Sequence, residues 1–175
     1  MHNVDVEAVE QTAARGREDE ASLRMPVQLS GDWHPEGGPQ FRATIPYPQG
    51  EVELAVDFPP PMGGTGAAPN PLAYCFFGGL ACYAMSFATE AARDGVEVRA
   101  LHATVRTEVD QSRALGLSDR PPVERIEWEL EVDADASAAT IERLKAQADD
   151  HCPGAYCLRN PIALETRVLQ AEERP

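Results

Sequence analysis

The chain has 175 residues, a formal net charge of −14 and 43% hydrophobic residues, which is the composition of a globular domain with a core of its own. The negative charge argues against nucleic acid or an anionic membrane as a partner, because both require a positive protein surface. No basic and apolar leader begins the chain, and its longest apolar run falls short of the ~18 residues of a membrane span. We therefore expect a cytoplasmic protein, whose four cysteines are reduced, catalytic or metal-bound rather than structural disulfides.

The N-terminal third divides into an arm and a group of strands. Residues 1–22 are polar and acidic, and the sequence predicts a flexible arm there, followed by a single domain over residues 23–175. Short alternating segments at residues 25–29, 40–45 and 51–58 predict a three-stranded antiparallel meander. The proline- and glycine-rich segment that follows, residues 59–69, predicts a loop.

A nearly all-apolar stretch after this loop predicts a long central helix. Asn70 suits the N-cap, Pro71 suits the first helical position, and the apolar run continues through Phe87 before a stop near Gly95. A helix that is hydrophobic on almost every side belongs at the centre of a domain or of a subunit interface.

The remaining residues predict two further strands, a second helix and a last strand. Residues 96–109 form a long strand with a bulge near Ala100, and residues 126–132 alternate strictly. Ser137 or Asp135 caps a helix that ends at His151, before Pro153, and residues 162–168 alternate again. This order of elements predicts an α+β fold rather than a regular parallel sheet.

The four cysteines fall into two groups, one on each predicted helix. Cys75 and Cys82 are seven residues apart, about 10 Å along a helix axis, which is too far for a disulfide. Any pair therefore joins the two helices, either as Cys82 with Cys152 or as Cys75 with Cys157. Three interpretations remain open: small buried hydrophobic residues, a four-cysteine metal site without CxxC spacing, or a redox pair.

A redox pair requires a thiolate, and the sequence offers several arginines that would stabilise one. Cys82 lies too deep in its helix to benefit from the helix dipole, so a nearby positive charge is the natural activator. Arg42 on the second predicted strand and Arg24 before the first are candidates, with Arg93 and Arg159 as alternatives. Each of them also fits a solvated surface position.

Two segments together resemble a known family. The first resembles the first cysteine motif of the OsmC/Ohr family, which comprises osmotically inducible protein C and organic hydroperoxide resistance proteins. It consists of residues 63–66, Asn70 and Pro71, and Cys82, which follows Pro71 by eleven residues. Residues 148–153 resemble its second motif, and the resemblance extends over residues 25–169. It implies an OsmC-like fold with an N-terminal β-meander, a long central helix, further antiparallel strands and a second helix. It also implies an intertwined homodimer with active sites at the subunit interface.

The function that this resemblance implies is that of a peroxiredoxin-type peroxidase in the oxidative stress response. Cys82 would be the nucleophile that attacks an organic hydroperoxide, and Cys152 would resolve the sulfenic acid to a disulfide. Arg42 would lower the pKa of the nucleophile. A dithiol reductant of the lipoyl or thioredoxin type would restore the thiols, and neither a cofactor nor a metal is expected.

The sequence departs from the family pattern in one important place. Hydroperoxide-resistance members carry a glutamate directly after the Asn-Pro pair, where it orients the arginine, but Leu72 stands here. Glu53, Asp57 or Glu51 would have to replace it.

The departure supports an alternative function, that of a diverged dimer without efficient peroxidase activity that binds an apolar small molecule or senses thiol oxidation. Its pocket would be lined by aromatic residues of the central helix. These are Tyr74, Phe76, Phe77 and Tyr83. Plain core packing is the competing interpretation of the same aromatic residues.

Overall fold

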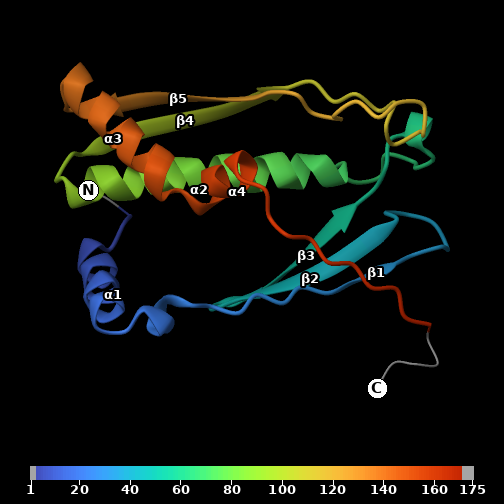
Figure 1. Ribbon diagram of the computed structural model, residues 1–175, viewed down its shortest axis with the longest axis horizontal. Helices are drawn as coiled ribbons and strands as arrows, with labels where there is room; N and C mark the ends of the chain where they lie inside the picture. The colour runs from blue at the N-terminus through green and yellow to red at the C-terminus, as the bar shows by residue number, and fades with distance from the viewer. Residues whose placement is uncertain (1–2, 171–175) are drawn as a thin grey trace.

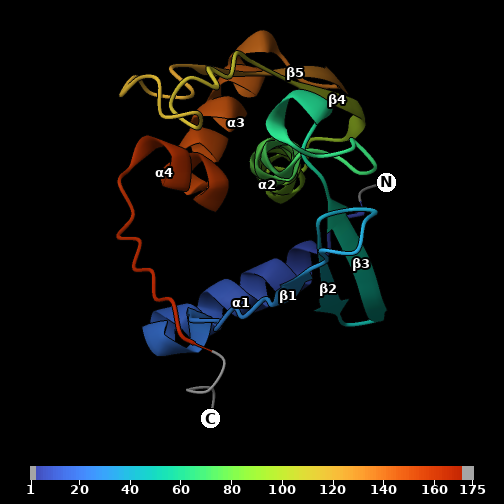
Figure 2. The same ribbon diagram turned by 90° about the vertical axis from the view of Figure 1, so that its right-hand side faces the viewer.

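The computed structural model describes residues 3–170 as an α+β fold with two separate antiparallel sheets. Strands β1 (Gly31–Trp33), β2 (Phe41–Tyr47) and β3 (Gly50–Val56) form the first sheet in the order β1-β2-β3. Strands β4 (Val98–Thr107) and β5 (Ile126–Ala134) form the second. Helix α2 (Pro71–Arg93) runs along the second sheet, with α3 (Ala138–His151) and α4 (Pro153–Arg159) beside it, while the first sheet and α1 (Val6–Glu18) form a separate layer (Figures 1 and 2).

Helix α2 begins as the sequence predicts and contributes half of the core. The side chain of Asn70 accepts a hydrogen bond from the backbone N–H of Leu72 at 2.8 Å, and Pro71 occupies the first turn. Tyr83, Phe87 and Ala91 of α2 are buried against residues of α3 and α4. The partners on these two helices are Leu144, Ala148, Cys152 and Ala155. Much of the remaining surface of α2 is left uncovered.

Helix α2 is strongly apolar, although much of its surface is exposed. By length and composition alone, with a mean hydropathy of 1.4, α2 qualifies as a membrane-spanning helix, and 11% of the qualifying window is buried. Gly, Cys and Ser interrupt the apolar residues of α2. A count of uninterrupted apolar residues therefore stays below the length of a membrane span, although the mean hydropathy of the helix is high. Core helices of soluble proteins meet the same criterion, which makes it weak evidence for a membrane. Phe77 and Met85 are 66% and 70% exposed, so α2 presents large apolar side chains to solvent in the single chain.

The β4–β5 hairpin confirms both strand predictions. Burial alternates along all nine residues of β5, as expected for a strand with one face on the core. The register of β4 against β5 shifts between Val98 and Ala100, where the sequence predicts a bulge. Trp128 and Leu130 of β5 pack on the core beneath the sheet.

The loop between β3 and α2 is held by one buried carboxylate. Asp57, 1% exposed, accepts hydrogen bonds from the backbone N–H groups of Thr65 and Ala67 at 3.1 and 2.9 Å and from the Thr65 hydroxyl at 2.6 Å. The Thr65 hydroxyl and the Ala67 N–H hold the pKa of Asp57 below its usual value. This carboxylate therefore organises the loop that leads into α2 through Oδ2.

The N-terminal segment contains a helix, whereas the sequence favours a flexible arm over a frayed helix there. Residues 6–18 form α1, with the Asp5 carboxylate capping the Ala8 N–H at 3.0 Å, and a 3-10 turn follows at Glu20–Leu23. Residues 1 and 2 lie outside the described part of the chain. The missed signals are the Asp5 cap and the half-buried Val6, Val9 and Ala13 at helical spacing. The strand predicted at residues 25–29 is also wrong, because that segment is irregular and exposed.

The segment after α4 keeps an alternating pattern but forms no strand within the described chain. Residues 161–170 belong to no helix or sheet, and they run away from α4 toward the layer of the first sheet (Figure 1). Ile162, Leu164 and Val168 are 61%, 86% and 99% exposed. A strand needs a neighbour for its backbone hydrogen bonds, and residues 3–170 supply none for this segment.

The total surface area shows how incompletely the chain covers itself. The accessible surface is 13432 Å² for a chain of 19.0 kDa. A folded monomer of this mass exposes about 8,400 Å². The excess is consistent with the exposed face of α2 and with the exposed segment that follows α4.

Candidate active site around two cysteines

Cys82 and Cys152 meet at the contact of α2 with the α3–α4 junction. The Cys152 thiol donates to the Cys82 Sγ across 3.6 Å. Cys152 is 1% exposed, and Cys82 is partly exposed. A disulfide has an S–S distance of about 2.05 Å, so a small movement of one side chain joins the pair. The geometry therefore favours the Cys82–Cys152 pairing among the alternatives that the sequence leaves open.

The position of Cys152 follows from the helix break at Pro153. Proline has no backbone N–H and cannot continue α3, but it suits the first position of a new helix. Cys152 consequently ends α3, with its N–H bonded to the Ala148 carbonyl at 3.0 Å, and caps α4. Its Sγ accepts a hydrogen bond from the Ala155 N–H at 3.4 Å. The sequence predicts the end of α3 but not α4.

Gly154 brings the first turn of α4 into contact with the Cys82 side chain. A Cβ atom at Gly154 would lie 3.1 Å from the Cys82 Cβ, 3.4 Å from its Sγ and 3.4 Å from the Gly79 carbonyl oxygen. A side chain at this position would fit only if its neighbours, mainly the Cys82 side chain, moved by a few tenths of an ångström. The absence of a side chain at Gly154 therefore keeps the two sulfurs in contact.

The local environment raises the pKa of the Cys82 thiol above its ordinary value. Burial is the largest cause, and the neighbouring Cys152 thiol adds to it, while a backbone hydrogen bond from Gly154 acts in the opposite direction. Among residues 3–170, no arginine side chain forms a hydrogen bond with Cys82. Within the described residues, no arginine therefore offsets the effect of burial on the pKa of this thiol.

A polar cluster next to the sulfurs fixes the three helices around them. The Tyr83 hydroxyl donates to the Asp149 carboxylate at 3.0 Å, and Lys145 and Arg159 contact the same carboxylate at 2.7 and 3.1 Å. Burial raises the pKa of Asp149, but the hydrogen bonds from Lys145, Arg159 and Tyr83 outweigh it and hold the pKa below its usual value. Arg159, one alternative activator, is thus engaged with Asp149.

The exposed side of Cys82 opens into a cavity of about 670 Å³ between α2 and α1. This hollow is more open to solvent than enclosed. Residues of α2 form its floor, with Val9 of α1 and His151 of α3 at its sides. The α2 residues are Gly78, Ala81, Cys82, Met85, Ser86, Thr89, Glu90 and Arg93. We call this cavity the Cys82 groove.

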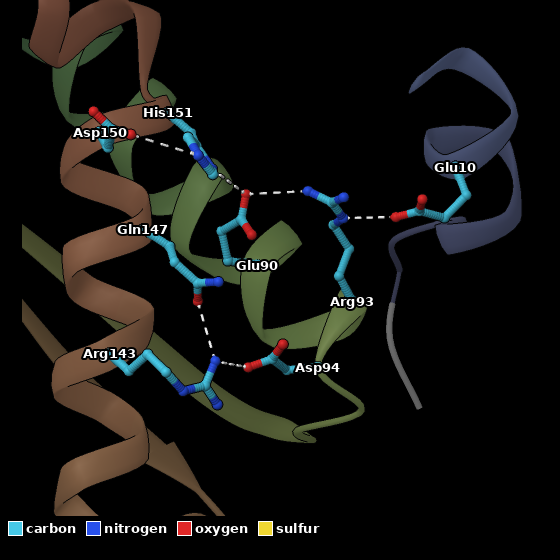
Figure 3. A network of polar contacts seen from close by, with 8 residues as sticks. All are labelled: Glu10, Glu90, Arg93, Asp94, Arg143, Gln147, Asp150 and His151. Carbon is cyan, nitrogen blue, oxygen red and sulfur yellow. Dashed lines mark hydrogen bonds and ion pairs between the residues drawn. The ribbon is translucent and has the colours of Figure 1, made fainter. Parts of the chain in front are cut away.

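A network of ionic and polar residues joins α1, α2 and α3 (Figure 3), and three of its members, Glu90, Arg93 and His151, also line the groove. Glu90, which is buried, contacts His151 Nδ1 at 3.0 Å and Arg93 at 3.6 Å. Arg93 Nε also donates to the Glu10 carboxylate of α1 at 2.7 Å. Arg143 of α3 binds Asp94 nearby. From the sequence, Arg93 is expected only as an alternative activator, and Val9 and Glu10 lie in residues 1–22, the predicted flexible arm. Glu90 was not among the predicted site residues.

The family is decided by a match over most of the domain. The family model described as OsmC-like protein matches residues 64–167, more than half of the chain. The chain belongs to the OsmC-like family. No curated protein matches the sequence.

Solved structures of OsmC-like proteins share the fold. An OsmC-like protein from Mycoplasma pneumoniae aligns with a TM-score of 0.58 and 15% identity, covering 78% of this chain and 89% of that one. An organic hydroperoxide resistance protein OsmC from Legionella pneumophila aligns with a TM-score of 0.53 and 18% identity, covering 78% and 92%. A Psychrobacter arcticus protein described as a putative osmotic stress induced and detoxification response protein aligns with a TM-score of 0.56 and 16% identity. The alignment covers 77% of this chain and 90% of that one. At these identities, the likeness concerns the OsmC-like fold alone.

Arg42, the activator expected from the OsmC-like pattern, lies on β2 and is not bonded to either sulfur among the described residues. Its guanidinium donates to Glu53 on β3 at 2.6 Å, and both side chains are exposed. Glu53 is one of the carboxylates offered as a replacement for the family glutamate at Leu72. The arginine–carboxylate pair therefore exists, and the role of Arg42 at Cys82 stays a prediction.

The two other cysteines do not join this site. Cys75 and Cys157 are both exposed free thiols. No group of three or more histidine, cysteine, aspartate or glutamate residues within residues 3–170 has the arrangement of a metal site.

Proposed function

We propose that this OsmC-like protein is a thiol peroxidase that reduces organic hydroperoxides through Cys82 and Cys152. The Cys82 thiolate attacks the distal oxygen of the hydroperoxide, and the O–O bond breaks. With one proton, the products are the alcohol and a Cys82 sulfenic acid. The Cys152 sulfur then displaces the hydroxyl group, which leaves as water after protonation, and an intrasubunit disulfide forms.

The single observation that carries the proposal is the sulfur contact beside an open groove. The sulfurs lie 3.6 Å apart, with Cys82 partly exposed to the groove and Cys152 buried behind it. This asymmetry suits an attacking thiol that meets the substrate and a resolving thiol that is protected from it. The name of the Legionella pneumophila protein, an organic hydroperoxide resistance protein, is consistent with the same chemistry in an oxidative stress response.

We further propose that the active unit is a homodimer assembled through α2. The exposed Phe77 and Met85 and the unpaired residues 161–170 provide apolar surface and free strand edges for a second copy. An obligate dimer buries on the order of 2,000–5,000 Å², which the excess surface of this chain is large enough to supply. Light scattering on the purified protein should give twice the chain mass of 19.0 kDa. A stable monomer at micromolar concentration would contradict this part of the proposal.

In the dimer, we propose that Arg42 supplies the positive charge that Cys82 lacks in the isolated subunit. The Arg42–Glu53 pair is exposed in the single chain, so a second copy could cover it. A guanidinium that is shielded from water stabilises a thiolate more strongly than a solvated one. The protein would act in the cytoplasm, where a dithiol of the lipoyl or thioredoxin type reduces the disulfide after each turnover.

The test of the proposed activity follows peroxide consumption with a dithiol as reductant. Wild-type protein should consume cumene hydroperoxide over many turnovers, and Cys82→Ser should lose this activity. In the same assay without the dithiol, Cys152→Ser should consume about one equivalent and stop at the sulfenic acid. Consumption by Cys82→Ser at the wild-type rate would remove the assignment. Cys75→Ser with Cys157→Ser is the matched control and should retain turnover, because both residues are exposed and outside the pair.

The raised pKa of Cys82 favours a second candidate function, that of a slow thiol sensor or apolar-ligand binder. Such a protein would form the Cys82–Cys152 disulfide once with a hydroperoxide but would not turn over with dithiols. The same assay separates the two functions: multiple turnovers support the peroxidase, and a single stoichiometric oxidation supports the sensor.

A further inference from the structure

A second contact between α2 and α3 lies beside the sulfur pair. Tyr83 follows Cys82 on α2, and Asp149 precedes Cys152 by three residues, almost one turn of α3. The hydroxyl of Tyr83, a buried residue, donates to Asp149 Oδ1 at 3.0 Å, while the Cys152 thiol donates to the Cys82 Sγ across 3.6 Å. The two contacts join the same two segments of the chain, so a shift of either segment changes both.

Two cations hold Asp149 in this position. Arg159 Nη2 donates to Asp149 Oδ1 at 3.1 Å, and Arg159 Nη1 donates to the Asp149 carbonyl oxygen at 2.8 Å. Lys145, four residues earlier on α3, donates to Oδ2 at 2.7 Å. Hydrogen bonds to a charged group are the stronger kind, and here they engage both carboxylate oxygens and the backbone. Since Arg159 is the last residue of α4, Asp149 connects α2, α3 and α4.

The open side of this network is distinct from the face of α2 that we propose for the dimer. The network lines a hollow of about 400 Å³, which β5 borders through Ile126 and Trp128. Phe77 and Met85, the exposed apolar residues of α2, are not among the described residues that line it. All of the hydrogen bonds of the network lie within one chain and do not require a second copy.

We propose that Asp149 is a positioning residue, which keeps the Cys152 sulfur beside Cys82 and thereby determines how an oxidised Cys82 reacts next. The inference rests on the proposed function and concerns its second step. Loss of the Tyr83–Asp149 bond would let the end of α3, and with it Cys152, move away from α2. Cys82 would keep its own place on α2.

The sulfenic acid at Cys82 has two competing fates. In the first, the Cys152 sulfur attacks the Cys82 sulfur, an S–S bond forms, the S–O bond breaks, and the oxygen leaves as water with the thiol proton. In the second, a further hydroperoxide transfers its distal oxygen to the Cys82 sulfur, which gives a sulfinic acid and a second molecule of alcohol. The first fate is intramolecular, and the second depends on the hydroperoxide concentration. Because thiols do not reverse the sulfinic acid, a well-placed Cys152 protects the site from inactivation.

The positioning role is tested first without any hydroperoxide, so that the result is independent of peroxidase activity. Reduced Cys75→Ser/Cys157→Ser protein is equilibrated in buffers of reduced and oxidised glutathione. Alkylation and mass spectrometry then give the fraction of Cys82–Cys152 disulfide. The equilibrium constant against glutathione measures how closely the protein holds the two thiols.

Tyr83→Phe removes the hydroxyl that donates to Asp149 and keeps the buried ring. We expect this variant to lower the equilibrium constant about three- to tenfold, because a hydrogen bond to a charged group is lost, and Asp149→Ala to lower it further. Glu142→Ala removes a carboxylate from an exposed position of the same helix and, as the matched control, should leave the constant unchanged. Tyr83→Phe decides the test if Asp149→Ala fails to fold. An unchanged or raised constant in Tyr83→Phe, or an equal fall in Glu142→Ala, would show that Asp149 does not position Cys152.

An excess of cumene hydroperoxide then tests the choice between the two fates. Rapid quenching and mass spectrometry follow the disulfide and the Cys82 sulfinic acid over time. We expect Tyr83→Phe to raise the ratio of sulfinic acid to disulfide about three- to tenfold, while the first oxidation of Cys82 keeps its rate. A general loss of structure would slow both steps. An unchanged ratio, or an equal slowing of both steps, would overturn the proposal. If no hydroperoxide oxidises Cys82 while the glutathione constants change as expected, the proposed function fails and the positioning role of Asp149 stands.

Discussion

Substitution of Gly154 by alanine tests whether the close approach of α4 to α2 is what keeps the sulfurs together. The added methyl group would lie 3.1 Å from the Cys82 Cβ and 3.4 Å from its Sγ, tighter than ordinary van der Waals contact. Overpacking of this kind costs about 1–3 kcal/mol, while the smaller backbone entropy of alanine in the unfolded chain returns about 0.4–1 kcal/mol. We expect a net loss of about 1–2 kcal/mol in the free energy of unfolding.

Two measurements distinguish this effect from a general loss of stability. Thermal unfolding of the reduced protein should show a Tm lower by about 2–8 °C, since 1 kcal/mol corresponds to about 2–4 °C at this size. Formation of the Cys82–Cys152 disulfide should slow, because α4 moves away from α2. Gly78→Ala, at which nothing lies within 4 Å of the added Cβ in the subunit, is the matched control. If Gly154→Ala forms the disulfide as fast as wild type and is as stable, the account of the sulfur contact is refuted.

Three further predictions follow from the core, the loop and the thiol. Leu144→Ala should lower the free energy of unfolding by about 2–5 kcal/mol in urea denaturation, because Leu144 is fully buried against α2; a loss below 1 kcal/mol would contradict this packing. The pKa of Asp57 is lowered by folding, so this carboxylate stabilises the protein above its unfolded pKa of about 3.9, and that stability is lost as pH falls through the folded value. Asp57→Asn should therefore flatten the decline in stability below pH ~4, and an unchanged acid limb would disprove the linkage. Arg42→Met should move the pH midpoint of Cys82 alkylation upward, toward the raised pKa of the thiol in the isolated subunit, so that less thiolate exists at pH 7. Identical midpoints would exclude Arg42 as the activator.

The elements with strong periodicity and capping signals were predictable from sequence. Helix α2 carries an Asn70 cap, Pro71 and an apolar run, and strand β5 alternates over its whole length, so local and tertiary preferences agree there. The Cys82–Cys152 contact was also among the predicted pairs, because helix geometry excludes a pair within α2. These features depend on short-range patterns, which a single sequence contains.

The errors lie where a segment depends on another part of the assembly. Residues 162–168 have the alternation of a strand, but backbone hydrogen bonds require a neighbour, and the described chain provides none. Helix α1 was missed because its composition is polar, although Asp5 and Val9 carried cap and stripe signals. The groove could not be predicted, since it depends on the long-range contact between Glu10 and Arg93.

The central claim is tested most directly by mapping the product of a single oxidation. Reduced Cys75→Ser/Cys157→Ser protein is mixed with one equivalent of cumene hydroperoxide, quenched by alkylation and analysed by mass spectrometry, with the alcohol product quantified in parallel. The account predicts one equivalent of alcohol together with an intrasubunit disulfide between Cys82 and Cys152, and a dimedone-trapped sulfenic acid at Cys82 in the Cys152→Ser variant. Recovery of both thiols unmodified, or trapping of the sulfenic acid at a residue other than Cys82, would contradict it.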